Sequence, residues 1–188
     1  EAGIRDWYFE EYPRQRIQED EARFVRIARD LATKAGIVRK RNNALVMTRK
    51  GEELLLDKQA LLETLIRVYV HLFNADDYDG FETIPGLGFR DAGLSILVFD
   101  KVRKGMPGET PTDWDYVRAY FNARPDAYTG ESSANGYMFR TYQTFMELFG
   151  MVTTDSYWDK EKMERFLSIN PTSLYDRMIF IDEEVDLI

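Results

Sequence analysis

Apolar residues recur every three or four positions between about Glu21 and Lys34, which is the spacing of one buried face of a helix. Gly36 follows and fits the left-handed backbone conformation that ends many helices. The sequence therefore predicts an amphipathic helix that stops at this glycine. Its apolar positions are Phe24, Ile27, Ala28, Leu31, Ala32 and Ala35.

Two short apolar runs follow the glycine, at residues 37–38 and 45–47, and a polar loop separates them. Asn42 and Asn43 in this loop tolerate the positive φ angles that tight hairpins require. Thr48 is placed to cap a further helix, because its hydroxyl can accept from free N–H groups of the next turn. A helix, a two-stranded wing and a second helix together predict the back half of a winged helix.

Apolar spacing and turn residues predict the rest of the chain as helices and loops. The densest apolar stretch, residues 57–73, is expected to form a central buried helix. Loops are expected at residues 74–89 and 128–136, where turn residues cluster. Further helices are predicted at residues 88–104, 113–124 and 137–149. The expected fold class is mostly α with short β-hairpins.

The last of these helices is followed by a segment that resembles the opening one. It ends ELFGMV where the first ends TKAGIV, so Gly150 corresponds to Gly36. Leu167 and Ile169 are matched with Leu45 and Met47, and Asn170 takes the capping place of Thr48, with Pro171 in the first helical turn. We therefore expect two degenerate winged-helix-like units, residues 1–73 (with an N-terminal arm) and 131–188, joined by a helical segment at residues 74–130. The second wing is acidic, which favours packing or protein contact.

Charge separates the first helix and wing from the rest of the chain. Residues 22–50 carry nine basic residues and one acid, a net charge of +8, whereas the whole chain carries −8. Such an excess suits a phosphate backbone, where each neutralised phosphate releases counterions. The alternative is that these cations only solvate the module or pair with acids elsewhere. The candidate nucleic-acid-binding residues are Arg26, Arg29, Lys34, Arg39, Lys40 and Arg41.

Residues 74–188 carry 11 basic and 21 acidic residues, so they would repel nucleic acid. The candidate partners are therefore duplex DNA at the first module, or a protein partner, including an upstream domain of the same protein. Aromatic residues in the loops are candidate protein contacts, because aromatic side chains are enriched at interface centres. The alternative is that these rings pack into the core. They are Tyr78, Phe81, Tyr128, Tyr157 and Trp158.

No pattern of catalytic or cofactor-binding residues is found. The chain has no cysteine, and its one histidine, His71, lies in the most apolar predicted helix, where we expect a partly buried structural residue. The acids Asp76, Asp77 and Asp79 do not fit the spacing of an EF-hand loop. We therefore predict neither an enzyme nor a bound metal or cofactor.

The chain also lacks the features of a membrane or secreted protein. The chain contains no run of about 18 apolar residues, so no membrane span is predicted. A charged start without an initiator methionine or an apolar signal region suggests a segment of a longer protein. The expected location is the cytoplasm.

The stretch AGIVRKRNNALVMTRKGEELL, residues 35–55, resembles a segment of an uncharacterised bacterial family associated with plasmid open-reading-frame proteins. Thr48, Lys50 and Gly51 carry the most specific part of the match. More loosely, the stretch resembles the wing and following helix of MarR-type regulators. The later LFGMV and FLSINPTSLYDRMI look like the closing element of the same bacterial family, with Asn170 in place of a threonine. The resemblance implies a winged-helix-like fold and no particular reaction.

Overall fold

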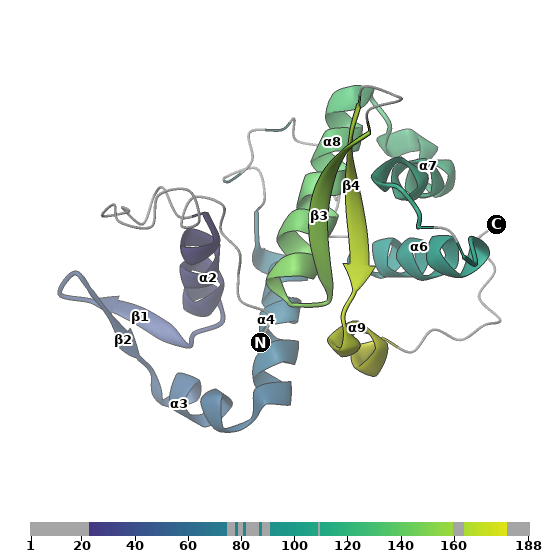
Figure 1. Ribbon diagram of the computed structural model, residues 1–188. Coiled ribbons are helices and arrows are strands. Elements are labelled where there is room, and N and C mark those ends of the chain that lie inside the picture. Colours follow the sequence, from purple (N-terminus) through teal and green to yellow (C-terminus); the bar gives the residue numbers. More distant parts are fainter. Residues whose placement is uncertain are drawn as a thin grey trace. The chain divides into compact units, whose positions relative to one another are not determined.

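The structure is a computed structural model of the 188-residue chain. It describes residues 23–74, 78, 81, 87, 91–108, 110–159 and 164–179, with the backbone alone at residues 23, 157–159, 164 and 165. The described part is mostly helical with two short antiparallel hairpins (Figure 1). The predicted fold class, mostly α with short β-hairpins, is therefore confirmed.

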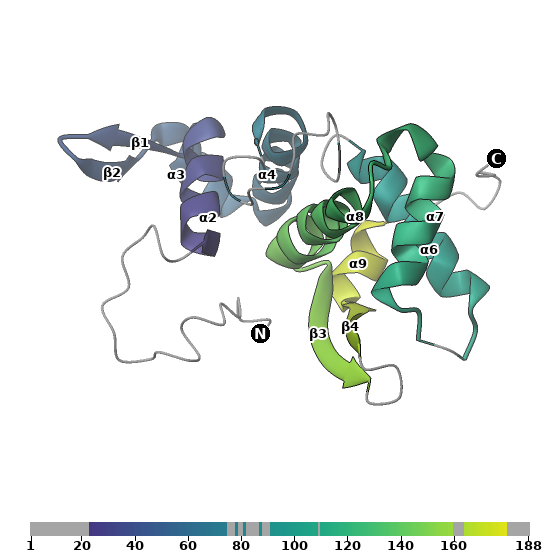
Figure 2. The ribbon, with the colours of Figure 1, turned by 90° about the horizontal axis from the view of Figure 1, so that it is seen from above.

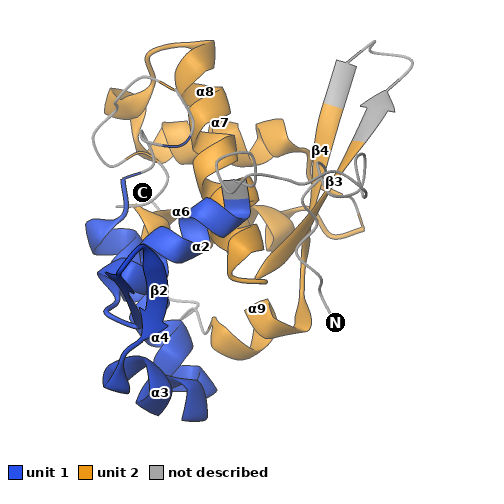
Figure 3. Ribbon diagram, turned by 90° about the vertical axis from the view of Figure 1, so that its left-hand side faces the viewer, with its two compact units in different colours: residues 1–78 blue, residues 79–188 orange. Residues whose placement is uncertain are grey.

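The chain divides into two compact units, residues 1–78 (unit 1) and residues 79–188 (unit 2) (Figure 3). The described elements of unit 1 are α2 (Arg23–Lys34), β1 (Val38–Arg41), β2 (Ala44–Met47), α3 (Arg49–Leu56) and α4 (Lys58–Leu72). Those of unit 2 are α6 (Ala92–Gly105), α7 (Asp113–Ala123), η1 (Pro125–Ala127), α8 (Glu131–Met138), the π-helical η2 (Phe139–Met146), β3 (Val152–Asp159), β4 (Glu164–Pro171) and α9 (Ser173–Met178). The three-part division at residues 73 and 130 stays a prediction.

The core of unit 1 lies between α2 and α4. The predicted apolar face of α2 is buried at its central positions, although Ala28 is exposed and Ala32 is half-buried. Helix α4 buries only one face, at Val68 and Tyr69, while Leu72 is 57% exposed. The expected central buried helix is therefore buried on that face, and the expectation is wrong at Leu72. The side chains buried from α2, the residues after it and the end of α4 are Phe24, Ile27, Leu31, Ala35, Ile37, Val68, Tyr69 and Phe73.

Strands β1 and β2 form the first hairpin, which extends away from the helices of unit 1 (Figures 1 and 2). Asn42 and Asn43 turn the chain with φ angles of 49° and 59°, as a type I′ turn requires. Thr48 then caps α3, accepting a hydrogen bond from the amide of Gly51. The helix, hairpin and cap predicted for this segment are all confirmed.

Unit 2 is built around stacked aromatic rings. Tyr120 and Tyr137 stack with their ring centroids 3.9 Å apart, and Phe99 contacts the rings of Tyr116 and Tyr175. The hydroxyls of Tyr137 and Tyr142 lie 3.3 Å apart, so these two buried groups share a hydrogen bond. Burying polar aromatic residues is favourable only when their hydroxyls find such partners.

The long helix of unit 2 begins earlier than its composition suggests. A loop is predicted through Gly136, yet α8 begins at Glu131 and continues into η2. Ser133, Ala134 and Gly136 are buried there, and their small size lets neighbouring side chains pack closely. A Cβ on Gly136 would lie only 3.4 Å from the ring of Phe81. Tertiary contact therefore overrides the weak helix propensity of this segment.

The second hairpin, β3 and β4, repeats the geometry by which α2 leads into the first. Gly36 and Gly150 have φ angles of 71° and 69°. The next residue in each copy donates to a carbonyl five residues back, Ile37 to Ala32 and Met151 to Met146, both at 2.8 Å. This arrangement is the Schellman motif.

A threonine closes this geometry in each copy, and we call the glycine, the following residue and this threonine the joint. Thr48 Oγ1 donates to the carbonyl of Gly36, and Thr172 Oγ1 donates to that of Gly150, each at 2.6 Å. Both threonines also donate their backbone amides at 2.9 Å, to Ile37 and Met151 respectively. The hydrogen bonds of the two joints therefore correspond one by one.

The joint corrects the predicted alignment of the second hairpin by two residues. Thr172 caps α9, whereas Asn170 pairs with Thr153 inside the hairpin. Counted back from the caps, Ile169 corresponds to Leu45, and Pro171 is the last residue of β4 and corresponds to Met47. A shift of two residues keeps every side chain on its own face of a strand, so the apolar pattern did not reveal it.

Candidate nucleic-acid interface

The first hairpin has one basic face and one apolar face. Arg39 pairs with Val46, and Arg41 pairs with Ala44, so the two arginines lie on the same face. Met47 lies on the opposite face with Lys40 and Leu45, and its sulfur lies close to Gly51 of α3. The apolar face therefore turns toward α3, and the two guanidinium groups are presented on the other side.

The three cations of β1 are the freest of the predicted contact residues. Arg39, Lys40 and Arg41 are all exposed, as is the whole of β2. Within the part of the chain that the structure describes, no carboxylate lies within ion-pair distance of any of them. Their charge is therefore open to an anionic ligand.

The predicted contact residues of α2 are more engaged. Lys34 Nζ lies 2.7 Å from a carboxylate oxygen of Asp30, which neutralises part of its charge. The guanidinium of Arg26 lies over the ring of Tyr78, 4.5 Å from its centroid. Arg29 is exposed, and its carbonyl accepts from Thr33. The cations of β1 are thus more available to a ligand than those of α2. Counting charges along the sequence does not reveal this difference.

Lys50 has a structural task that the sequence did not indicate. Its Nζ donates to the carbonyl of Ala35 at 2.7 Å, at the end of α2. A cation there complements the negative end of the helix and satisfies one of its free carbonyls. Arg49 pairs with Glu53 at 3.0 Å, but both side chains are largely exposed. Lys50 therefore ties the first turn of α3 to the end of α2.

The aromatic residues predicted as protein contacts divide into different groups. Tyr78 stacks on Phe73, and Phe81 lies against Phe139, so both rings pack within their own units. Tyr128 is 53% exposed and touches Phe121 edge-on. The side chains of Tyr157 and Trp158 lie outside the described residues.

The remaining sequence predictions concern His71, metals and membranes. His71 is exposed, so the expectation that it is partly buried is wrong. The acids Asp76, Asp77 and Asp79 lie outside the described residues, and the described part contains no group of three or more side chains placed to hold a metal. None of the described helices is long and apolar enough to cross a membrane.

Comparison with known proteins identifies no relative of this chain. No protein-family model, no curated protein and no solved structure matches the chain. The resemblance to a plasmid-associated bacterial family and to MarR-type regulators therefore stays a prediction.

Proposed function

We propose that unit 1 is a winged-helix-type module that contacts duplex nucleic acid through the first hairpin. The observation that carries the proposal is the exposed basic face of β1, where Arg39 and Arg41 lie side by side and no carboxylate of a described residue pairs with them. Guanidinium groups donate in a planar fork that matches phosphate oxygens. Helix α2, which precedes the hairpin, adds the exposed Arg29.

Binding of this kind reads the phosphate backbone and not the bases. Neutralising phosphates releases condensed counterions, and this gain is independent of sequence. The acidic residues 74–188 repel DNA, which confines the contact to unit 1. We therefore expect salt-sensitive binding with little preference among duplex sequences.

Fluorescence anisotropy with a labelled duplex at low salt tests this proposal. The double variant Arg39→Gln and Arg41→Gln should weaken binding by about tenfold, because two charge-assisted contacts to phosphate are removed. The loss should be similar for duplexes of different sequence.

A matched control removes two charges from another exposed surface of the same unit. Lys58 and Arg67 are exposed on α4 and make no ion pair with a described residue. Lys58→Gln with Arg67→Gln should leave the affinity unchanged. Equal losses in the two double variants would mean that only net charge matters, and no binding by the wild-type chain would remove the proposal altogether.

A protein partner is the second candidate function, and a separate observation favours it. Unit 1 exposes large apolar side chains on β2 and α3, including Leu45 at 52% and Leu56 at 90%. Exposed apolar residues of this size are typical of contact surfaces. Under this alternative, Leu45→Gln and Leu56→Gln weaken capture of the partner in a pull-down while duplex binding is absent or unchanged.

A further inference from the structure

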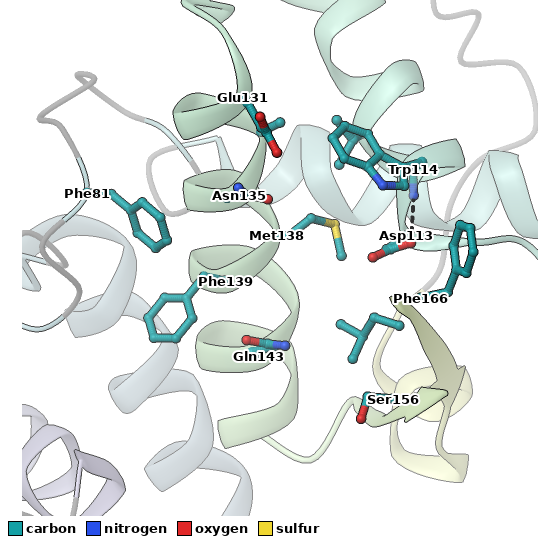
Figure 4. A pocket seen from close by; sticks show the side chains of 13 residues that line it. Phe81, Asp113, Trp114, Glu131, Asn135, Met138, Phe139, Gln143, Ser156 and Phe166 are labelled. Atoms are coloured by element: carbon teal, nitrogen blue, oxygen red, sulfur yellow. Dashed lines mark hydrogen bonds between the residues drawn. The ribbon is translucent and has the colours of Figure 1, made fainter. Parts of the chain in front are cut away.

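A cavity of about 990 Å³ lies within unit 2, between α7, the helix formed by α8 and η2, and the second hairpin (Figure 4). The backbone bridge between Thr112 and Ser168 brings the start of α7 against β4. The side of the cavity formed by α7 and α8 carries buried Val117, Ala134 and Met138. A cavity of this volume falls within the range of small-molecule sites, and its lining mixes polar and apolar surface.

Two carboxylates line this cavity, Asp113 at the start of α7 and Glu131 at the start of α8. No lysine or arginine is among its described lining residues, so neither charge is balanced from within the cavity. The carboxylate of Asp113 accepts a hydrogen bond from the amide of Trp114 at 3.1 Å. Burial raises the pKa of Asp113, although backbone hydrogen bonds oppose the rise. The folded protein therefore holds this carboxylate where its charge is disfavoured.

Aromatic side chains also line the cavity, and Trp114 and Phe166 lie on the same side of it as Asp113 (Figure 4). Trp114 is 38% exposed beside Asp113, and Phe166, Phe81 and Phe139 line other parts of the cavity. Aromatic faces attract organic cations, and carboxylates give the matching charge. Asn135 and Gln143 add amide groups that can fix the orientation of a ligand.

We propose that this cavity binds a small organic cation, whose ammonium group meets Asp113 and whose aromatic or alkyl body lies against the apolar lining. The charge of Glu131, elsewhere in the cavity, adds to the attraction. The proposal concerns unit 2 alone and is independent of duplex binding by unit 1. A free small molecule is favoured over a peptide side chain, because the volume of the cavity is that of a whole ligand and not of one side chain.

Isothermal titration calorimetry with phenethylamine and phenethyl alcohol tests the proposal, because the two probes share a body and differ in charge. The amine should bind about tenfold or more tightly than the alcohol. Asp113→Asn should remove most of this difference, and Glu131→Gln should reduce it. Equal binding of the two probes, or an unchanged preference in Asp113→Asn, would overturn the proposal.

Asp155 provides the matched control. It is an exposed acid on β3, next to Ser156 of the cavity, and strand alternation places it on the opposite face. Asp155→Asn should bind the amine as the wild type does, and a loss equal to that of Asp113→Asn would show only a long-range charge effect. Asp113→Asn should unfold at no lower temperature than the wild type, because it removes a charge that burial disfavours. If a lysine-rich peptide binds this cavity and phenethylamine does not, the small-molecule proposal is wrong.

Discussion

Gly51 allows α3 to lie closer to Ile37 of the first joint than a residue with a Cβ would. It is buried, and its amide donates to Thr48 Oγ1 at 3.0 Å. A Cβ at this position would overlap the carbonyl oxygen of Ile37 and lie 2.6 Å from the sulfur of Met47. The first of these atoms belongs to the backbone and cannot move aside cheaply. The need for glycine here is therefore steric.

Gly51→Ala should lower the free energy of unfolding of unit 1 by about 1–3 kcal/mol, as overpacking of a tight contact does. Hydrogen exchange at the amides of Ile37 and Thr48 measures the effect locally. Gly93→Ala in α6 is the control, since a Cβ there meets nothing within 4 Å. It should raise stability by about 0.5 kcal/mol through the lower backbone entropy of the unfolded chain. If Gly51→Ala were as harmless as Gly93→Ala, the close approach would be refuted.

The joint occurs twice in this chain, once at the base of each hairpin. The two hairpins differ in how much of them is buried. The first hairpin is exposed on β2 and beyond the first residue of β1. The second buries Phe166, Leu167 and Ile169, and it is bridged to α7 at Thr112 and Ser168. The same local geometry thus supports a free basic hairpin in unit 1 and one wall of a cavity in unit 2.

Thr48→Val and Thr172→Val should each lower the free energy of unfolding by about 1–2 kcal/mol, because each removes a helix cap and a half-buried hydroxyl donor. Exchange of the Gly51 and Tyr175 amides, which donate to these hydroxyls, is the local readout. Thr153→Val, at an exposed position of β3, should cost almost nothing. A loss in only one of the two cap variants would show that the joints are alike in shape but not in energy.

Local signals explain what could be predicted from the sequence. The glycine stop at Gly36, the turn at Asn42 and the cap at Thr48 act within a few residues, so each was identifiable. The cavity was not, because its walls come from three separated segments, near residues 113, 135 and 166. The pairing of Lys34 with Asp30 has the spacing of neighbours on a helix, but the sequence alone does not decide between such a pair and a phosphate contact.

Alkaline pH probes the aromatic core that holds unit 2 together. Burial raises the pKa of Tyr116 and of Tyr137 from 10.0 to about 12. An unfolded chain loses these protons near pH 10, whereas the folded one retains them, so stability is complete below pH 10 and falls as the pH approaches 12. Urea unfolding followed by circular dichroism should show this decline. Tyr116→Phe should make it shallower, and a decline of unchanged steepness would contradict the assignment.

At the scale of the whole molecule, the charge is divided between a basic hairpin region and an acidic remainder. Residues 22–50 carry +8 within a chain of −8. Such a division directs an anionic ligand to one surface and keeps it from the rest. The local charge, and not the net charge of the chain, is what the proposed duplex contact depends on.

The salt dependence of duplex binding tests this claim most directly. The slope of the logarithm of the association constant against the logarithm of salt concentration counts the phosphates neutralised, at about 0.9 for each. Arg39→Gln with Arg41→Gln should reduce that slope by about 2, while Lys58→Gln with Arg67→Gln leaves it as in the wild type. A slope that is the same for all three proteins would contradict the proposed role of the first hairpin.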